Sequence, residues 1–553
     1  MFTGYFFCPR RNLFVYASVF LFFHTFLLFA DVPQQIIEWQ QTAEQCIAAN
    51  DYAGARRHYQ KIIDAYPKTD YALSALHQIA VLEIESGKES GKYDAAEAAI
   101  GKILTDYSGY SGTCKSIRKI AYAYFKANQY DRSKELCRLV LMNWPNHMES
   151  MFARRDLAIN HIRLGEYDQA DVETARLGVD FSNNSEAGDC IGLIASYYFT
   201  PKKPEKAKEL CLLALSRWPN HSKSARTLYV LASSLIKLGE FEEADLITAQ
   251  LLKNYPRYPS LCEYLAKIAS YYAEFGRPLK AIELYQIAKD RWPQDNAQIW
   301  VQAGLAAAAL KNKDFTSAEA ETNGLVFGFS VHKDFSDAVS WLGDEYLRQE
   351  QHDKAKELYE LALGGNSSTS GRFRAYAGLA RLYAKVGDDD KVQENLNILL
   401  KKFARERKFG GAIFEIGEEY YLLAQEAMQE GFIEKADMSY DKAIHLWQHN
   451  IEHADPHYQC LSYYNSADVY QKMRKEKEAI FCFQQVIEKW PDFEHAWNAL
   501  YQIAVCYDRL YRRGELSNEE ARQQIIEICS KLEKQYPNSK AAIAAESLLA
   551  SYQ

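Results

Sequence analysis

Apolar and polar residues follow one another along most of the chain with the period of an amphipathic helix, in short runs separated by helix-breaking residues. Residues 189–199, DCIGLIASYYF, place Ile191, Ile194, Ala195 and Tyr198 at helical spacing. The following segment, TPKKPEK, contains two prolines, which interrupt a helix. A second helical run, KAKELCLLALSRW, is stopped by the next residue, Pro219. The pattern predicts two helices joined by a short turn.

This pair of helices is repeated along the chain. Relatives of residues 206–219 occur at 132–145, 280–293 and 354–366, with successive copies 74 residues apart. The intervening copies are marked by small residues, and most of these are followed by another small residue twelve positions later. We predict that two helices approach closely at each such position, because a larger side chain would push their axes apart. The longest unbroken series, with a spacing of 37, is Ala158, Ala195, Ala232, Ala269, Ala306, Gly343, Ala380 and Gly417.

A single hairpin of two helices cannot bury its apolar face, so stacked neighbours must complete the core. The sequence therefore predicts an all-α array of about thirteen 37-residue units over 36–538, followed by a capping helix over 539–553. The phase slips near 85–90, 422–432 and 509–520, where we expect longer helices.

The unit resembles the tetratricopeptide repeat, whose usual length is about 34 residues. The resemblance implies a right-handed α-solenoid, or superhelix, of helix-turn-helix repeats. Longer units similar to these are found in exported bacterial members of the family, including envelope-assembly lipoproteins. The residues that match the family pattern best in one copy are Leu265, Ile268, Ala269, Tyr272, Ala281, Tyr285, Ala288 and Pro293.

The resemblance also implies where a partner would bind. Ligands of this family usually lie in the concave groove that is lined by the first helix of each repeat. Aromatic and arginine side chains at those positions would suit binding hot spots. The groove positions carried over to this chain are Arg118, Tyr122, Phe125, Arg155, Phe199, Arg226, Tyr229, Trp300, Arg374, Arg381, Phe414, Tyr421, Tyr464 and Tyr501.

Composition and motifs exclude several other functions. The formal charge of −8 and the pI near 6.0 give no basic bias, and only short basic clusters occur, so no nucleic-acid partner is expected. No nucleophile elbow, phosphate-cradling glycine loop or HExxH motif is present. We therefore expect neither an enzyme nor a cofactor.

The cysteines could form a thiol site or disulfides and the histidines could bind a metal, but the repeat pattern argues against each of these. Cys137 and Cys211 occupy a position that holds tyrosine in other copies, so we interpret them as core residues rather than a thiol site. Most of the cysteine pairs spaced by 21–23 residues lie too far apart along the predicted hairpins to form disulfides. His445, His449, His453 and His457 are four residues apart, but Pro456 should end their helix before the last of them. No metal site is predicted.

The N-terminus is a targeting segment. Arg10 and Arg11 precede an apolar run over 13–30, which is typical of a signal peptide. The run is also long enough, at about 1.5 Å per residue, to span a bilayer as an uncleaved anchor. Residues 1–31 are thus a signal peptide or an N-terminal membrane anchor, and the rest of the chain is expected to be exported to the periplasm or cell envelope.

The sequence as a whole predicts a non-enzymatic scaffold or adaptor that binds a partner protein or peptide in its groove. Contact with a membrane would be made only through the N-terminal segment, if that segment stays uncleaved. The alternative is a periplasmic module that binds a glycan or small molecule on the aromatic groove positions.

Overall fold

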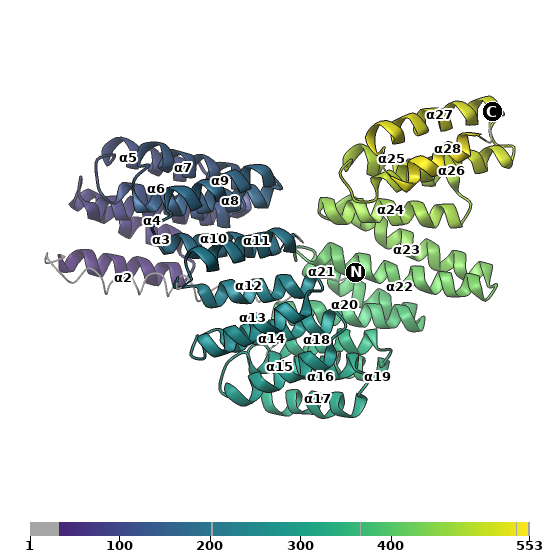
Figure 1. Cartoon of the computed structure of the whole chain (residues 1–553), viewed down its shortest axis with the longest axis horizontal. Coiled ribbons are helices and arrows are strands. Elements are labelled where there is room, and N and C mark those ends of the chain that lie inside the picture. Colours follow the sequence, from purple (N-terminus) through teal and green to yellow (C-terminus); the bar gives the residue numbers. More distant parts are fainter. Residues whose placement is uncertain (1–32, 201–202, 220, 365–366, 538, 551–553) are drawn as a thin grey trace. The chain divides into compact units, whose positions relative to one another are not determined.

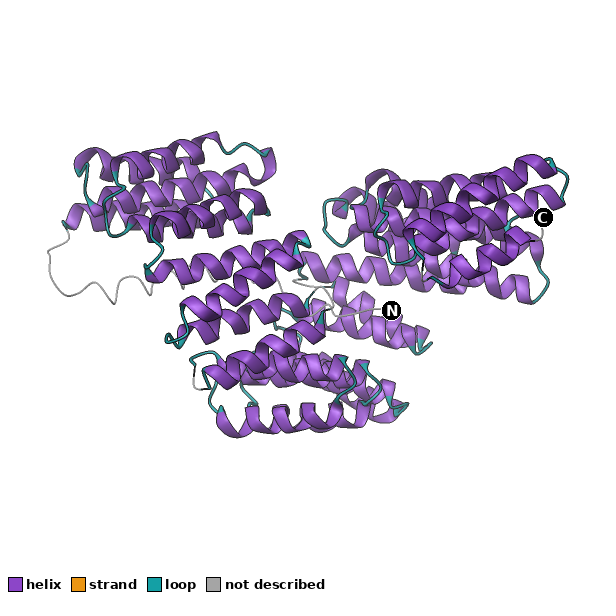
Figure 2. Ribbon diagram, turned by 45° about the horizontal axis from the view of Figure 1, so that its top comes forward, coloured by secondary structure: helices purple, strands orange, loops and turns teal. Residues whose placement is uncertain are grey.

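The computed structural model describes residues 33–200, 203–219, 221–364, 367–537 and 539–550, and these form helices and connecting loops without strands (Figure 2). The signal or anchor predicted for residues 1–31 lies outside the described residues. Within them, no helix combines the length and the apolar character that crossing a membrane requires. The chain divides into two compact units, residues 1–297 (unit 1) and 298–553 (unit 2).

Unit 1 is built from consecutive helix pairs (Figure 1). Its helices are α2 (Gln34–Ala48), α3 (Tyr52–Ala65), α4 (Asp70–Ser90), α5 (Asp94–Asp106), α6 (Thr113–Lys126), α7 (Tyr130–Asn143), α8 (Met148–Leu164), α9 (Tyr167–Asp180), α10 (Glu186–Phe199), α11 (Pro204–Arg217), α12 (Ser224–Lys237), α13 (Phe241–Asn254), α14 (Leu261–Glu274) and α15 (Pro278–Arg291).

Unit 2 continues in the same way and ends in a single helix that packs against the last pair. Its helices are α16 (Gln298–Lys311), α17 (Phe315–Phe329), α18 (Phe335–Arg348), α19 (His352–Leu363), α20 (Thr369–Val386), α21 (Asp389–Phe403), α22 (Phe409–Gln429), α23 (Ile433–His453), α24 (Pro456–Lys472), α25 (Glu476–Lys489), α26 (Ala496–Arg512), α27 (Asn518–Gln535) and α28 (Lys540–Ala550).

Each even-numbered helix from α2 to α26 packs against the helix that follows it, which gives thirteen hairpins in the described residues. The even-numbered helix is called the first helix of its hairpin. From α4 to α14, and again from α16 to α24, successive first helices also contact one another. The first-helix face is defined here as the side of unit 1 and of unit 2 that is formed by the first helices, α26 included. The array of stacked hairpins predicted from the sequence is confirmed.

The small residues that define the repeat lie where the helices meet. All eight residues of the unbroken series are buried, as predicted. A methyl group added to Gly343 would lie 2.8 Å from the ring of Tyr359 on the second helix, and one added to Gly378 would lie 2.2 Å from it. Tyr359 itself is fully buried, as is Cys211 at the equivalent position of an earlier hairpin. The repeat therefore fixes close packing of the two helices.

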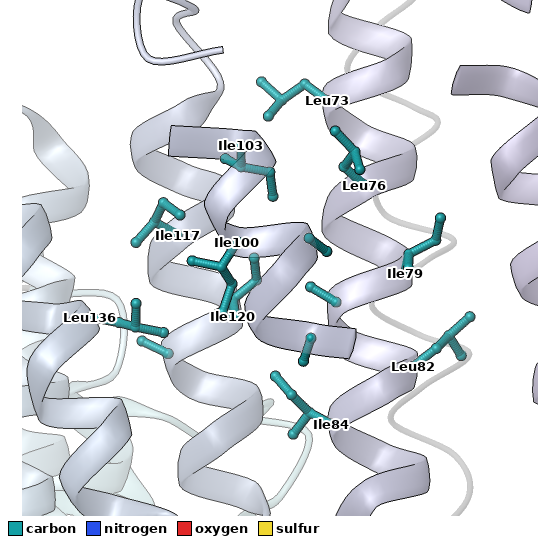
Figure 3. Close-up of a cluster of buried hydrophobic side chains, with 14 of the residues drawn as sticks. Leu73, Leu76, Ile79, Leu82, Ile84, Ile100, Ile103, Ile117, Ile120 and Leu136 are labelled. Carbon is teal, nitrogen blue, oxygen red and sulfur yellow. The ribbon is translucent and has the colours of Figure 1, made fainter. Parts of the chain in front are cut away.

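Apolar side chains from neighbouring hairpins form a shared core. In unit 1, Ile100 and Ile103 of α5 pack with Ile117 and Ile120 of α6, beside the leucines and isoleucines of α4 (Figure 3). The tryptophan that precedes the repeat proline adds a polar link, since Trp218 Nε1 donates a hydrogen bond of 3.0 Å to the carbonyl of Ser182 in the loop before α10. All ten described cysteines are free, and nine of them are buried in the core.

The turns between the two helices repeat a backbone conformation as well as a sequence. Residues with positive φ occur at 128, 165, 239, 276, 313, 350 and 387, which lie 37 residues apart except for one step of 74 between 165 and 239. Glycine occupies four of these positions, where its lack of a Cβ makes the conformation accessible without strain. Lys313 and Glu350 adopt it with φ of 60°.

The three predicted phase slips are longer helices. The 21-residue α4 contains the first of them. In the second, α22 and α23 are each 21 residues long, against 14 residues in most hairpins of unit 1. The third lengthens α26 to 17 residues and α27 to 18.

Candidate binding face

The predicted groove residues all lie on first helices, some in unit 1 and the others in unit 2. Their positions are α6 (Arg118, Tyr122, Phe125), α8 (Arg155), α10 (Phe199), α12 (Arg226, Tyr229), α16 (Trp300), α20 (Arg374, Arg381), α22 (Phe414, Tyr421), α24 (Tyr464) and α26 (Tyr501).

The aromatic residues of unit 1 contact one another across intervening helices. The ring centroids of Phe125 on α6 and Tyr197 on α10 are 6.0 Å apart, although α8 separates these helices in the row. In the same way, Phe199 on α10 lies 5.5 Å from Tyr271 on α14, past α12. Such contacts require the row of first helices to bend toward this face. The side chains then fill the inside of the bend.

Cationic side chains cover several of these rings. The ammonium group of Lys126 lies 5.1 Å from the Tyr122 ring centroid, and that of Lys237 lies 3.8 Å from Phe199. Arg163 lies 4.9 Å from Tyr197, and each such pair is a favourable cation–π contact. Tyr122, with 42 % of its surface exposed, is the most accessible of the predicted aromatic positions in unit 1.

Three other predicted aromatic residues also pack against rings of this chain. Tyr229 on α12 stacks on Tyr264 of α14 with ring centroids 4.5 Å apart, and burial raises the pKa of Tyr229 well above its ordinary value. In unit 2, Trp300 packs edge-on against Trp341 at 6.4 Å. Phe414 is buried and lies 5.9 Å from Trp447.

Most of the predicted groove arginines already have carboxylate partners. Arg118 forms ion pairs with Glu149 and Asp156, and Arg155 also contacts Asp156, at 2.6 Å. Arg118 thereby links α6 to α8, whereas Arg155 pairs within α8, and neither arginine presents free charge.

The same arrangement links three first helices of unit 2. Arg374 lies 3.5 Å from Asp344 of α18, and Arg381 lies 2.9 Å from Glu415 and 3.1 Å from Glu419 of α22. Arg226 of unit 1 differs, because its Nε is buried without a hydrogen-bond partner and no ion pair of its side chain occurs in the part of the chain that is described.

Glu418 of α22 combines partial burial with the lack of such a partner among the described residues. Glu418 follows Glu415 by three residues and is half-buried, and no hydrogen bond or ion pair of its side chain occurs within the described ranges. Burial, and to a lesser extent the charges of Glu415 and Glu419, raise the pKa of Glu418 to about 7, against the opposing effect of Arg381. Its protonation therefore changes near neutral pH.

A cavity of about 360 Å³ opens on the first-helix face at the C-terminal end of unit 2. One predicted groove residue, Tyr464, lines it, whereas Tyr501 does not. The walls come from the first helices α24 and α26 and from the second helix α25, and the lining residues are Tyr464, Asp468, Gln471, Lys472, Phe483, Asn498, Gln502 and Arg509.

Comparison with known families matches four segments of the chain. Models described as "Tetratricopeptide repeat" match residues 42–69, 226–258, 336–364 and 462–488. The last three segments coincide with the hairpins α12–α13, α18–α19 and α24–α25, and the first spans the end of α2 and all of α3. The chain is a tetratricopeptide repeat protein. Its first-helix face is thus the face that the family resemblance assigned to partner binding.

Individual relatives of this tetratricopeptide protein are distant. The outer membrane protein assembly factor BamD of Rickettsia prowazekii is 25% identical over 188 residues, which cover 30% of this chain and 74% of that protein. Among solved structures, yeast Tom70 is 13% identical with a TM-score of 0.39, covering 79% of this chain and 96% of Tom70. A tetratricopeptide repeat protein from Parabacteroides merdae is 16% identical with a TM-score of 0.33, covering 45% and 92% of the two chains.

Tetratricopeptide arrays form extended surfaces on which other proteins bind.

The four histidines spaced four residues apart, His445 to His457, do not form a metal site in the structure. Helix α23 ends at His453 and α24 begins at Pro456, so His457 lies on a different helix from the other three, as predicted. In the part of the chain that the structure describes, no three His, Cys, Asp or Glu side chains are grouped so that they could hold a metal ion.

The cavity contains polar residues that the sequence analysis did not select. The sequence selected only aromatic and arginine residues at the inherited groove positions, so it missed Gln471, Asn498 and Gln502. Arg509 was missed because it lies about two turns beyond Tyr501, the groove position of α26. The sequence did contain a signal for two of these residues. Gln471 lies on the same face of its helix as Tyr464, and Asn498 lies on the same face of its helix as Tyr501, in each case at helical spacing.

Proposed function

We propose that this chain is a non-enzymatic scaffold of the cell envelope that binds a segment of a partner protein on its first-helix face. The observation that carries the proposal is the open cavity between α24 and α26, because it is a hollow on the face that the repeat architecture offers to partners. The repeat lattice explains the buried residues, but it does not require the polar lining of this hollow.

Two observations support the envelope as the location. The apolar segment over 13–30, preceded by Arg10 and Arg11, has the pattern of a signal peptide or an anchor. The similarity to BamD, whose name describes assembly of outer membrane proteins, agrees with an exported scaffold. Whether residues 1–31 are cleaved or retained decides between a periplasmic and a membrane-anchored form.

The alternative, a glycan-binding module, has less support from the geometry. A sugar would need exposed aromatic faces, but in unit 1 these rings contact one another and are covered by Lys126, Arg163 and Lys237. A protein segment that contacts helix surfaces and one polar hollow does not depend on free ring faces.

Site-specific photocrosslinking in the native host tests the proposal. A photoreactive amino acid is placed at Gln502, inside the cavity, and in a second strain at Met438, which is 63% exposed on the second helix α23. We expect a discrete crosslinked species from the Gln502 position, in the envelope fraction, and none from the Met438 position. Equal crosslinking at both positions, or recovery of the protein in the cytosol with its N-terminus intact, would contradict the proposal.

A further inference from the structure

We propose that one edge of unit 2 rests on an anionic lipid bilayer through the connections α17–α18 and α21–α22. This edge, called the loop edge, consists of residues 327–333 and 401–407, at the C-terminal ends of α17 and α21 and in the loops that follow. The inference goes beyond the proposed function, because it adds a lipid surface to the partner segment on the first-helix face. The sequence alone predicted membrane contact only through the N-terminal segment.

The repeat places the two segments of the loop edge at equivalent positions. Phe327 and Lys401 are 74 residues apart, which is two repeat units, and Val331 and Arg405 have the same separation. Both segments lead from a second helix to a first helix, so they lie at the same end of their hairpins. The first helices α18, α20 and α22 contact one another in turn. At an interaxial distance of 8–10 Å for each contact, the two connections lie about 20 Å apart along one edge.

The α17–α18 connection presents bulky apolar side chains to solvent. Phe327 is 83% exposed and Val331 is 98% exposed, whereas Leu325 of the same helix is fully buried in the core. The repeat therefore takes its core residue from Leu325 and does not need the other two. Exposed apolar side chains of this kind gain free energy when they enter the interfacial region of a bilayer.

The α21–α22 connection presents positive charge. Its stretch 401–407 contains four exposed cationic residues and one acidic residue, Glu406, and no ion pair of these cations occurs within the described ranges. Two of the cations lie in the last turn of α21, where they also stabilise the C-terminus of the helix. The other two follow the end of the helix, so this role does not explain them. The exposed cations of the whole loop edge are Lys333, Lys401, Lys402, Arg405 and Arg407.

An anionic bilayer matches both parts of this surface. Each lysine or arginine close to such a bilayer raises the affinity roughly fivefold, and the apolar side chains add to this attraction. A nucleic acid would satisfy the cations but offers no apolar layer for Val331. The next connection, between α23 and α24, carries Glu452 and Asp455, which limits the cationic surface to the edge between α17 and α22.

Amide hydrogen exchange of the full-length protein, measured by mass spectrometry, tests the proposal. The protein is mixed with vesicles of phosphatidylcholine alone or of phosphatidylcholine with phosphatidylglycerol. Residues 1–31, if retained, would attach the protein to both kinds of vesicle, so only the difference between them reports on the loop edge. We expect exchange in 404–408 to slow at least about threefold on the anionic vesicles only, and to recover in about 1 M salt, where charges are screened beyond roughly 3 Å.

The turn 312–314, at the opposite end of α17, is the internal control and should exchange equally on both vesicles. Equal slowing in 404–408 on neutral and anionic vesicles would overturn the proposal. Equal slowing by a single-stranded oligonucleotide without lipid would instead identify a general polyanion site and overturn the assignment to a bilayer.

Variants identify the residues responsible. The double variant Lys401→Gln and Arg405→Gln should lower the population of the docked state roughly tenfold to thirtyfold, since two cations are removed. Its matched control, Arg522→Gln with Lys534→Gln, removes two exposed cations from α27 and should leave the protection unchanged. Phe327→Gln, which keeps every charge, should also weaken the protection. Equal effects of the two double variants would refute the assignment to the loop edge.

The outcome is separable from that of the proposed function. A partner crosslinked from Gln502, without any protection of 404–408 by anionic vesicles, would leave the scaffold function standing and refute the lipid surface. Protection that depends on Lys401 and Arg405, without any crosslinked partner, would establish the lipid surface and refute the scaffold function.

Discussion

Glu418 gives a pH-dependent prediction whose size follows from its surroundings. Burial and the neighbouring Glu415 and Glu419 raise the pKa of Glu418 from its ordinary value of 4.5 to about 7. Because the folded state then holds its proton more tightly than the unfolded state, the stability of unit 2 should fall as pH rises between these two values. Above pH 7 the penalty is complete and constant. Glu418→Gln removes the ionisation and should therefore stabilise the fold at alkaline pH.

The magnitude can be bounded. A pKa difference of one unit corresponds to about 1.36 kcal/mol, so the full shift would give roughly 3 kcal/mol. Glu418 is only half-buried, and solvent screening should reduce this to about 1–2 kcal/mol. In a unit of this size that free energy corresponds to an increase in Tm of about 2–6 °C.

The assay is thermal unfolding followed by far-ultraviolet circular dichroism at pH 5 and pH 8. We expect Glu418→Gln to raise Tm at pH 8 and to change it by less than about 1 °C at pH 5. Glu426→Gln, at an exposed position of the same helix α22, is the matched control and should have no effect at either pH. The reasoning fails if Glu418→Gln lowers Tm at pH 8, or if its effect is the same at both pH values.

Three further predictions concern the repeat itself. Gly378→Ala would place a methyl group 2.2 Å from the Tyr359 ring and should destabilise unit 2 by about 1–3 kcal/mol; an unchanged urea midpoint would count against the packing described. Cys211 should react slowly with a thiol reagent in the folded protein, because it is fully buried and burial raises the pKa of its thiol; rapid labelling without denaturant would contradict this. Urea unfolding should occur in blocks, so that fluorescence of tryptophans in units 1 and 2 reports different midpoints, and coincident transitions would argue for a single cooperative structure.

The buried half of this molecule could be predicted because the repeat constrains it. Small residues at 37-residue intervals and the tyrosine or cysteine that faces them can pack in only one way in a helical hairpin, so periodicity was enough to place Gly343 against Tyr359. The turn conformation shared by Gly276 and Glu350 could not be read from residue type, since only one of them is a glycine.

The binding face was less predictable because its contacts depend on how successive hairpins are rotated relative to one another. The sequence placed Arg155 and Phe199 on first helices correctly. It did not indicate that Arg155 would be paired with Asp156. Nor did it indicate that Phe199 of α10 would contact Tyr271 of α14, past the intervening first helix α12. The cavity depends on the same rotation, since Lys472 of α24 and Arg509 of α26 line it together.

The contacts of Phe125 with Tyr197 and of Phe199 with Tyr271 limit how far this protein is modular. Repeat proteins are commonly described by a one-dimensional model with one energy for each repeat and one for each nearest-neighbour interface. In unit 1 a further energy, between second neighbours, is needed. Excising one hairpin would therefore do more than shorten the array by one interface, since it would also change the partner of every aromatic residue that reaches past it. Consensus repeats inserted into this region would meet the same obstacle.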